Sequence, residues 1–214
     1  MPSKAYSTFT KNVQQVDRLL EAYDLLQGPK RGKRKLDHLT RAALMFLCSS
    51  WEVYIEQVAN ESGEKIAKNI NEIKKLPKKI KKTIAKQINK NKNDEEAILF
   101  IDSWREYYLG MLDMKTKGLN TPKQAQVTEL FEDYLGINKD LIDSSILMIS
   151  EIDEIIVTRG EVAHNVFAER YLKKNVVDKY YDIIKMAVRD VDVMLYNYIP
   201  SVVDKGKKPW NNTY

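Results

Sequence analysis

The sequence predicts an all-α fold, an antiparallel helical bundle of about four long helices with shorter helical insertions. Three observations predict it. Glycine and proline are scarce, with 8 and 6 among 214 residues, so few positions interrupt regular structure. Apolar residues recur every three or four positions over long stretches, which is the period of a helix face. No stretch shows a convincing alternation of apolar and polar residues, the pattern of a half-buried strand.

The first part of the chain predicts two long helices joined by a basic loop. Helical spacing of apolar residues predicts an amphipathic helix over about residues 8–27. The stretch GPKRGKRK, residues 28–35, predicts a loop because two glycines interrupt it. Asp37 is expected to cap a second helix that reaches about Ser62. Because Ala42–Cys48 is apolar on every side, this second helix is expected to lie at the centre of the bundle.

The middle of the chain, about residues 64–120, predicts a basic helical insertion. A stripe of isoleucines at helical spacing runs through residues 64–92. Pro77 is expected to begin a new helix at its first turn. A further helix is predicted over about residues 95–114, and a short one from Pro122 to Gly136.

The last part predicts two more long helices. Isoleucines step by three or four residues from Leu141 towards His164, which predicts one continuous helix. The same argument predicts a last helix over about residues 172–199. Residues 1–200 are therefore expected to form a single domain, followed by a C-terminal tail over residues 201–214.

Charge and cysteine content narrow the class of protein. Residues 1–120 hold 23 Lys and Arg against 15 Asp and Glu, a net charge of +8, whereas residues 121–214 hold 12 against 15, a net charge of −3. This asymmetry favours a polyanionic partner. The single cysteine, Cys48, excludes an internal disulfide and a cysteine-based zinc site. No stretch has the length of a signal peptide or a membrane span, so a cytoplasmic protein with no membrane contact is expected.

The stretch VTRGEVAHNVF, residues 157–167, places Arg159 and one of only two histidines, His164, five positions apart. Neutral histidine can take a proton from a ribose 2′-OH, and protonated histidine can give one to a leaving oxygen. Arginine can hold a phosphate and stabilise the charge that develops on it. Neither role needs a metal or another cofactor. The pair therefore predicts RNA cleavage, and the alternative is a structural histidine beside an arginine paired with Glu154 or Glu161.

Helix geometry affects how Arg159 and His164 can act together. On an ideal helix they lie about 140° apart and about 7.5 Å apart along the axis. Gly160 is expected to let the helix loosen, which would bring them to the same side. A two-fold dimer would pool two histidines and two arginines in one cleft, so that one histidine acts as base and the other as acid.

These residues resemble a known family. The motif R-G-E-V-A-H-N, with RAALMFLCSSWEVYIEQV and LNTPKQAQVTELFEDYLGI before it, is similar to the RiboL-PSP branch of the HEPN superfamily over residues 36–199. The resemblance implies a helical, metal-independent endoribonuclease that acts as a homodimer in toxin–antitoxin or phage-defence systems. Arg159 and His164 match the motif Arg and His.

The chain departs from the family pattern at two positions. The family commonly has Asn after the Arg and Gly after the His, where this sequence has Gly160 and Asn165. Asn165 is expected to take over some of the polar contact. Members that are silenced by nucleotidyl transfer have Tyr two residues after the His. Val166 stands there, so this mode of control is not expected.

Two carboxylates are candidates for supporting roles at the site. Glu52, on the central helix, is expected either to orient His164 or Arg159 or to serve as a plain ion-pair partner. Glu161 is expected either to raise the pKa of His164 through its charge or to face solvent.

Basic residues are candidates for RNA contact. Residues 74–92 hold nine lysines and no acidic residue, a composition that suits either phosphate binding or a solvated helix face. The predicted RNA-binding residues are Lys78, Lys79, Lys81, Lys82, Arg31 and Arg34. The sequence as a whole favours a toxin or antiviral-defence endoribonuclease with RNA, a second copy and an antitoxin or other defence protein as partners. The alternative is a non-catalytic interaction or regulatory module of a defence complex.

Overall fold

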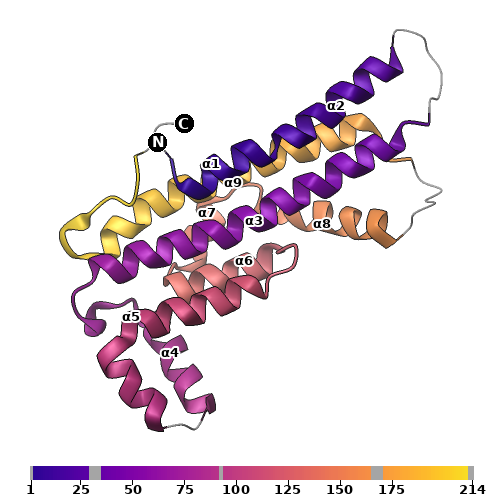
Figure 1. Ribbon diagram of the computed structural model, residues 1–214. Helices are drawn as coiled ribbons and strands as arrows, with labels where there is room; N and C mark the ends of the chain where they lie inside the picture. The colour runs from indigo at the N-terminus through magenta and orange to yellow at the C-terminus, as the bar shows by residue number, and fades with distance from the viewer. Residues whose placement is uncertain (1, 29–34, 92–93, 165–170, 212–214) are drawn as a thin grey trace.

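A computed structural model describes residues 2–28, 35–91, 94–164 and 171–211. Across these ranges the regular structure is entirely helical, with no strand. The predicted all-α class is therefore confirmed. Figure 1 shows an elongated bundle, with long helices lying side by side and a shorter helical pair extending from one end.

The first predicted helix is present as two segments, α1 (Lys4–Asn12) and α2 (Gln14–Gln27). It begins earlier than predicted because the Ser3 hydroxyl caps α1, accepting a hydrogen bond from the Tyr6 amide at 2.9 Å. Ser3 in turn donates to the buried Asp192 carboxylate. The Glu61 carboxylate accepts from the amides at the start of α1.

The second predicted helix, α3, runs over Asp37–Asn69. The expected cap at Asp37 is wrong by one position: Leu36 precedes the helix, and the Asp37 carboxylate instead pairs with Arg41 at 3.7 Å. The helix also continues well past Ser62, because Ile66 and Ala67 are buried and extend its packing surface.

α3 is the central element, as its apolar sequence predicted. Side chains are buried along its whole length, among them Trp51, Tyr54, Ile55 and Val58. The last helix, α9 (Lys174–Val202), runs in the same direction as α3. Two contacts fix this direction: Thr40 donates to the Leu172 carbonyl at 2.8 Å, and Tyr54 donates to the Val188 carbonyl at 2.9 Å.

The basic insertion forms an arm at the far end of α3. A 3-10 turn (Ile73–Lys75) leads to α4 (Lys78–Asn91), which begins directly after Pro77, one residue later than predicted. The next helix, α5 (Asp94–Lys117), returns to the bundle and is kinked at Ser103. We call α4 and the part of α5 before Ser103 the arm. Its buried Ile80 and Ile84 attach α4 to the bundle.

The predicted helix ending at Gly136 is present as α6 (Gln124–Leu130) and the π-helix η2 (Phe131–Leu135). Gly136 ends it in the left-handed region with φ 77°, and a Cβ at this position would collide with Pro77.

The continuous helix predicted from Leu141 to His164 is wrong. The structure has two helices, α7 (Lys139–Ser145) and α8 (Ile149–His164), separated by residues 146–148. The polar run Asp143–Ser145 is a weak helix former. The break allows both Ile146 and Ile149 to reach the core.

After α9 the chain forms a short 3-10 turn, η3 (Asp204–Gly206), and Trp210 packs partly buried against the core. None of the helices in the described ranges combines the length and apolar character that crossing a bilayer requires.

Candidate functional site

The candidate pair lies on α8, which is a regular helix through Gly160 to His164. The expected loosening at Gly160 is therefore wrong. A regular helix keeps Arg159 and His164 about 140° apart and about 7.5 Å apart along its axis. A Cβ built on Gly160 would meet nothing within 4 Å, so this part of α8 is uncovered.

Arg159 points towards the bundle and is half-buried. Its Nε is buried and has no hydrogen-bond partner. No hydrogen bond or ion pair joins its guanidinium to any described residue. Glu154 is occupied otherwise, since it accepts from the Tyr180 hydroxyl at 3.0 Å, and Glu161 is exposed. Among the described residues, Arg159 therefore forms no ion pair with Glu154 or Glu161, which was the alternative interpretation of the motif.

The surroundings of Arg159 are defined by the central helix. Burial raises the pKa of the Cys48 thiol to about 12, while the positive charge of Arg159 lowers it and the negative charge of Glu52 raises it. Both charged groups therefore lie near this thiol. Cys48 is fully buried, which makes it an inert packing residue.

Glu52 is half-buried, and its carboxylate accepts a hydrogen bond from the Thr121 backbone amide. It makes no hydrogen bond to Arg159, and none joins it to His164 within the described residues. The observed role of Glu52 is thus to hold the loop before α6. Any influence on Arg159 acts through its charge.

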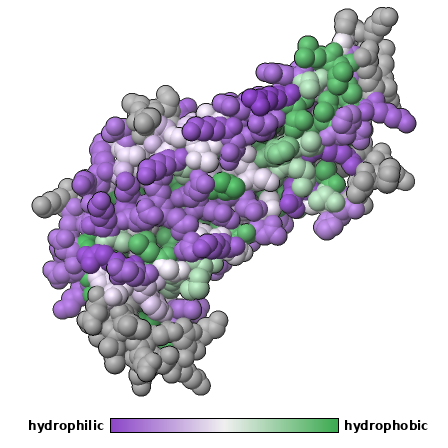
Figure 2. Space-filling view, in the orientation of Figure 1, coloured by the Kyte–Doolittle hydropathy of each residue, from purple (hydrophilic) through white to green (hydrophobic). Residues whose placement is uncertain are grey.

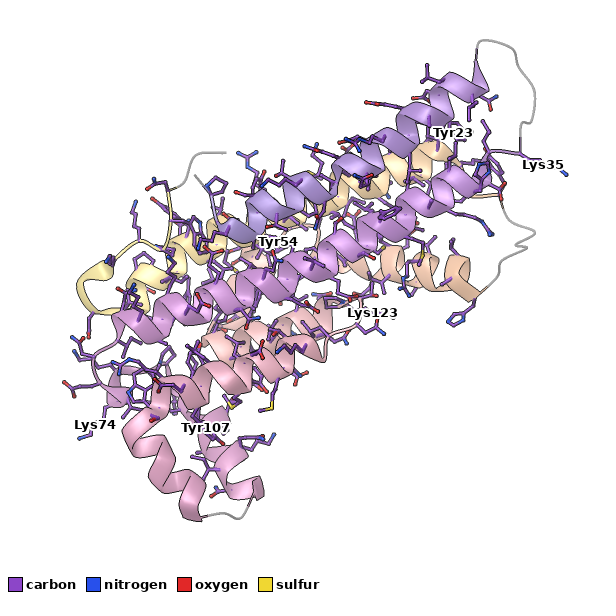
Figure 3. The ribbon with its side chains drawn as sticks, in the orientation of Figure 1. Tyr23, Lys35, Tyr54, Lys74, Tyr107 and Lys123 are labelled. Atoms are coloured by element: carbon purple, nitrogen blue, oxygen red, sulfur yellow. The ribbon has the colours of Figure 1, made fainter. Side chains whose placement is uncertain are left out.

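The loop over residues 119–123 is held by contacts from both sides of the site. Trp51 Nε1 donates to the Pro122 carbonyl at 2.9 Å, and the Gln124 amide donates to Asp153 of α8 at 2.8 Å. Thr121 adopts a left-handed backbone with φ 47°, which is unfavourable for a β-branched residue. No local sequence pattern predicts these contacts, and the stretch LNTP was notable only as part of the family resemblance. Figure 3 shows Lys123 of this loop below α3.

His164 is exposed at the end of α8, on a different side of the helix from Arg159. The exposed Glu161 and Val157 precede it by one and two turns on the same face. Within one chain the structure does not bring the imidazole and the guanidinium to one point. Asn165 lies outside the described residues.

The end of the molecule that carries His164 is built from four helix ends. At this end the Tyr171 hydroxyl lies 2.7 Å from that of Tyr23 on α2. Lys174, at the start of α9, pairs with Asp24 at 3.4 Å. The ends of α2 and α8 and the starts of α3 and α9 all lie at this end of the bundle, as Figure 1 shows. Arg31 and Arg34, which come between α2 and α3 in the sequence, lie outside the described residues.

Exposed apolar side chains also occur near this end. Figure 2 shows hydrophobic atoms gathered where α2 ends. Leu25 is 84% exposed, and Phe46 of α3 and Val157 of α8 are each 49% exposed. Apolar groups left in water beside an uncovered helix are typical of a surface that binds another protein.

The predicted RNA-binding lysines are in the arm, at the opposite end of the bundle from the end of α8 (Figure 1). Two of them have intramolecular contacts: Lys79 pairs with Glu132 at 3.3 Å, and Lys81 donates to the Lys74 carbonyl at 2.7 Å. Lys78 and Lys82 are exposed. These lysines do not line the surroundings of Arg159 or His164.

Within the described ranges, no group of three or more His, Cys, Asp or Glu side chains is arranged to hold a metal ion.

Comparison with known protein families finds a match over most of the chain. The model of the family described as RiboL-PSP-HEPN matches residues 11–197, which include every element from α2 to most of α9. No curated protein and no solved structure matches the chain.

Proposed function

Because the chain belongs to the RiboL-PSP branch of the HEPN superfamily, we propose that it is a metal-independent endoribonuclease. The family is generally one of ribonucleases. Arg159 and His164 are the residues of this chain that match the family motif, and they supply acid–base and phosphate-stabilising chemistry.

In the proposed reaction, one neutral His164 takes the proton of a ribose 2′-OH. The 2′-oxygen attacks the adjacent phosphorus, and the bond from phosphorus to the 5′-oxygen of the next nucleotide breaks. A second, protonated His164 gives its proton to that leaving oxygen. The products are a 2′,3′-cyclic phosphate and a 5′-hydroxyl. Arg159 stabilises the negative charge on the phosphate oxygens.

The observation that carries this proposal is the Arg159 guanidinium, whose Nε is buried without a partner and which pairs with none of the described residues. Buried polar groups are almost always hydrogen-bonded, and a buried N–H left without a partner is costly. Arg159 has its Nε buried beside Cys48 without a partner. A phosphate is the kind of group that satisfies a guanidinium at two points.

The position of His164 supports a homodimer as the active form. One chain presents His164 to solvent on a different face from Arg159, so a second copy is needed to supply the acid and the base together. The exposed Val157, two turns before His164 on the same face of α8, offers a surface for packing of a second copy. The proposed setting is a toxin or antiviral-defence system in the cytoplasm, with an antitoxin or other defence protein as a further partner.

The test of this function is the chemistry of the products. Purified protein is incubated in EDTA with an end-labelled RNA and with the same RNA carrying 2′-O-methyl groups throughout. We expect cleavage of the first RNA only, with 2′,3′-cyclic phosphate ends. Expression should also slow growth, and Arg159→Ala should relieve this effect. Intact RNA in EDTA, or cleavage of the methylated RNA, would contradict the proposal.

A further inference from the structure

The exposed face of α4 holds three lysines in a row. Lys78, Lys82 and Lys86 are spaced four residues apart, so they follow one line along the helix at intervals of about 6 Å. All three are exposed, and none has an ion-pair partner among the described residues. We call these three residues the lysine stripe. Lys86 was not among the lysines that the sequence predicted for RNA contact.

The lysine stripe is unfavourable for the isolated protein. Like charges four residues apart on a helix repel each other, and this arrangement occurs twice along the stripe. Lys78 is also in the first turn of α4, where positive charge opposes the helix dipole and no acidic residue compensates it. A local rule that is broken without compensation from the described side chains indicates a functional surface.

Packing does not require these lysines. Ile80 and Ile84 are almost fully buried and attach α4 to the bundle from the opposite side of the helix. Because the described apolar residues of α4 are used in this way, the lysine face has no apolar anchors of the kind that a membrane-binding helix needs. A soluble polyanion is the ligand that fits an exposed row of cations that pair with none of the described side chains.

The stripe is far from the proposed reaction site. Cys48 of α3 lies near Arg159, and Ile70 at the end of α3 lies just before the arm. At about 1.5 Å per residue, these two residues are about 33 Å apart along the helix. His164 lies about 7.5 Å further along α8, away from the arm. Figure 3 shows this separation, with Lys74 beside the arm and Lys35 at the other end of α3.

We propose that the lysine stripe is a second RNA-binding site, about 40 Å from the cleavage site, so that the preferred substrate is an RNA long enough to reach both. This inference rests on the proposed function. A stacked strand advances about 3.4 Å per nucleotide, so about 12 nucleotides span the distance. The lysines contact phosphates, which position the strand without reading its sequence. A dimer would carry two such stripes, one on each side of the shared site.

The experiment compares RNAs of about 8 and about 30 nucleotides that contain the same cleavage sequence. The test variant is the triple substitution Lys78→Gln, Lys82→Gln, Lys86→Gln. The matched control is Lys11→Gln, Lys139→Gln, Lys207→Gln, which removes the same charge from exposed lysines of α1, α7 and the segment after η3. A third variant replaces the stripe lysines by arginine.

For the wild type we expect a lower KM for the long RNA than for the short one. The test variant should lose this advantage and bind the long RNA about tenfold or more weakly. The slope of log K against log salt concentration should become smaller by about 2, because each lost phosphate contact to a single strand contributes about 0.7. The matched control and the arginine variant should behave as the wild type does.

The outcomes separate this proposal from the proposed function. If the wild type cleaves both RNAs and the test variant keeps the length advantage and the salt slope, the second site is refuted while the nuclease stands. The same holds if the test variant loses only binding to anionic phospholipid vesicles. If the wild type cleaves neither RNA, the proposed function itself fails.

Discussion

Replacing Arg159 by methionine is expected to stabilise the protein while removing its activity. The Arg159 Nε is buried without a partner, and no described carboxylate forms an ion pair with its guanidinium. An unsatisfied buried donor costs about 1–3 kcal/mol. Because Arg159 is only half-buried, we expect a gain towards the low end of this range, about 1–2 kcal/mol. Methionine fills the space of the arginine stem without leaving a donor unpaired.

Arg105→Met is the matched control, because Arg105 is the same side chain with its donors satisfied. It donates to the carbonyls of Ala67 at 2.9 Å and Ile70 at 2.7 Å, at the end of α3. Its removal leaves helix-end carbonyls without partners and should cost about 2–4 kcal/mol.

The assay for this pair is thermal unfolding followed by circular dichroism. For a chain of this length 1 kcal/mol corresponds to about 2–4 °C in Tm. Arg159→Met should therefore raise Tm by about 2–8 °C, and Arg105→Met should lower it. A lower Tm for Arg159→Met would refute the reasoning, because it would mean that the guanidinium has a structural partner.

Two further predictions concern α8 and the start of the chain. Gly160→Ala should raise the free energy of unfolding in urea by about 1 kcal/mol, because Gly160 is within a regular helix and a Cβ there meets nothing. A loss of stability would show that this face is covered. Burial raises the pKa of Glu61 although the amides of Ala5 and Lys4 lower it, so folded protein holds this proton more tightly than unfolded protein does. The stability of the wild type relative to Glu61→Gln should thus fall as the pH rises above the ordinary carboxyl pKa. Equal Tm differences between the two proteins at pH 4 and pH 7 would contradict this.

The spacing of apolar residues predicted a helix well where one pattern of buried positions runs along the whole helix. The apolar run around Cys48 predicted the central helix, because only a helix surrounded by others can be apolar on all sides. Pro77 and Gly136 marked a helix start and a helix end, since each residue type has a backbone preference that fits that position.

Periodicity failed where the chain changes direction without a glycine or a proline. The isoleucine pattern continues across residues 146–148, so it predicted one helix where α7 and α8 are separate. Spacing alone does not distinguish a continuous helix from two helices that bury their apolar residues in the same core. The end of α3 was placed too early for a related reason, since the chain becomes more polar before the buried Ile66 and Ala67.

The residues of the candidate site were found from their chemistry and from the family resemblance, but their environments were not. Whether Arg159 is paired depends on which side chains of other helices surround it, and no local pattern contains this information. Glu52 illustrates the same limit. Its position on the central helix made it a candidate for orienting the motif, whereas its carboxylate accepts from the Thr121 amide in a loop distant in sequence.

The most direct test of the account is RNA cleavage in EDTA by the wild type and by His164→Ala, with the oligomeric state of both measured by analytical ultracentrifugation. His164 is exposed at a helix end, so its truncation should leave the fold and the dimer intact. The account predicts that the wild type cleaves labelled RNA without metal and that His164→Ala, still dimeric, does not. Equal cleavage by both proteins, or none by the wild type, would contradict it.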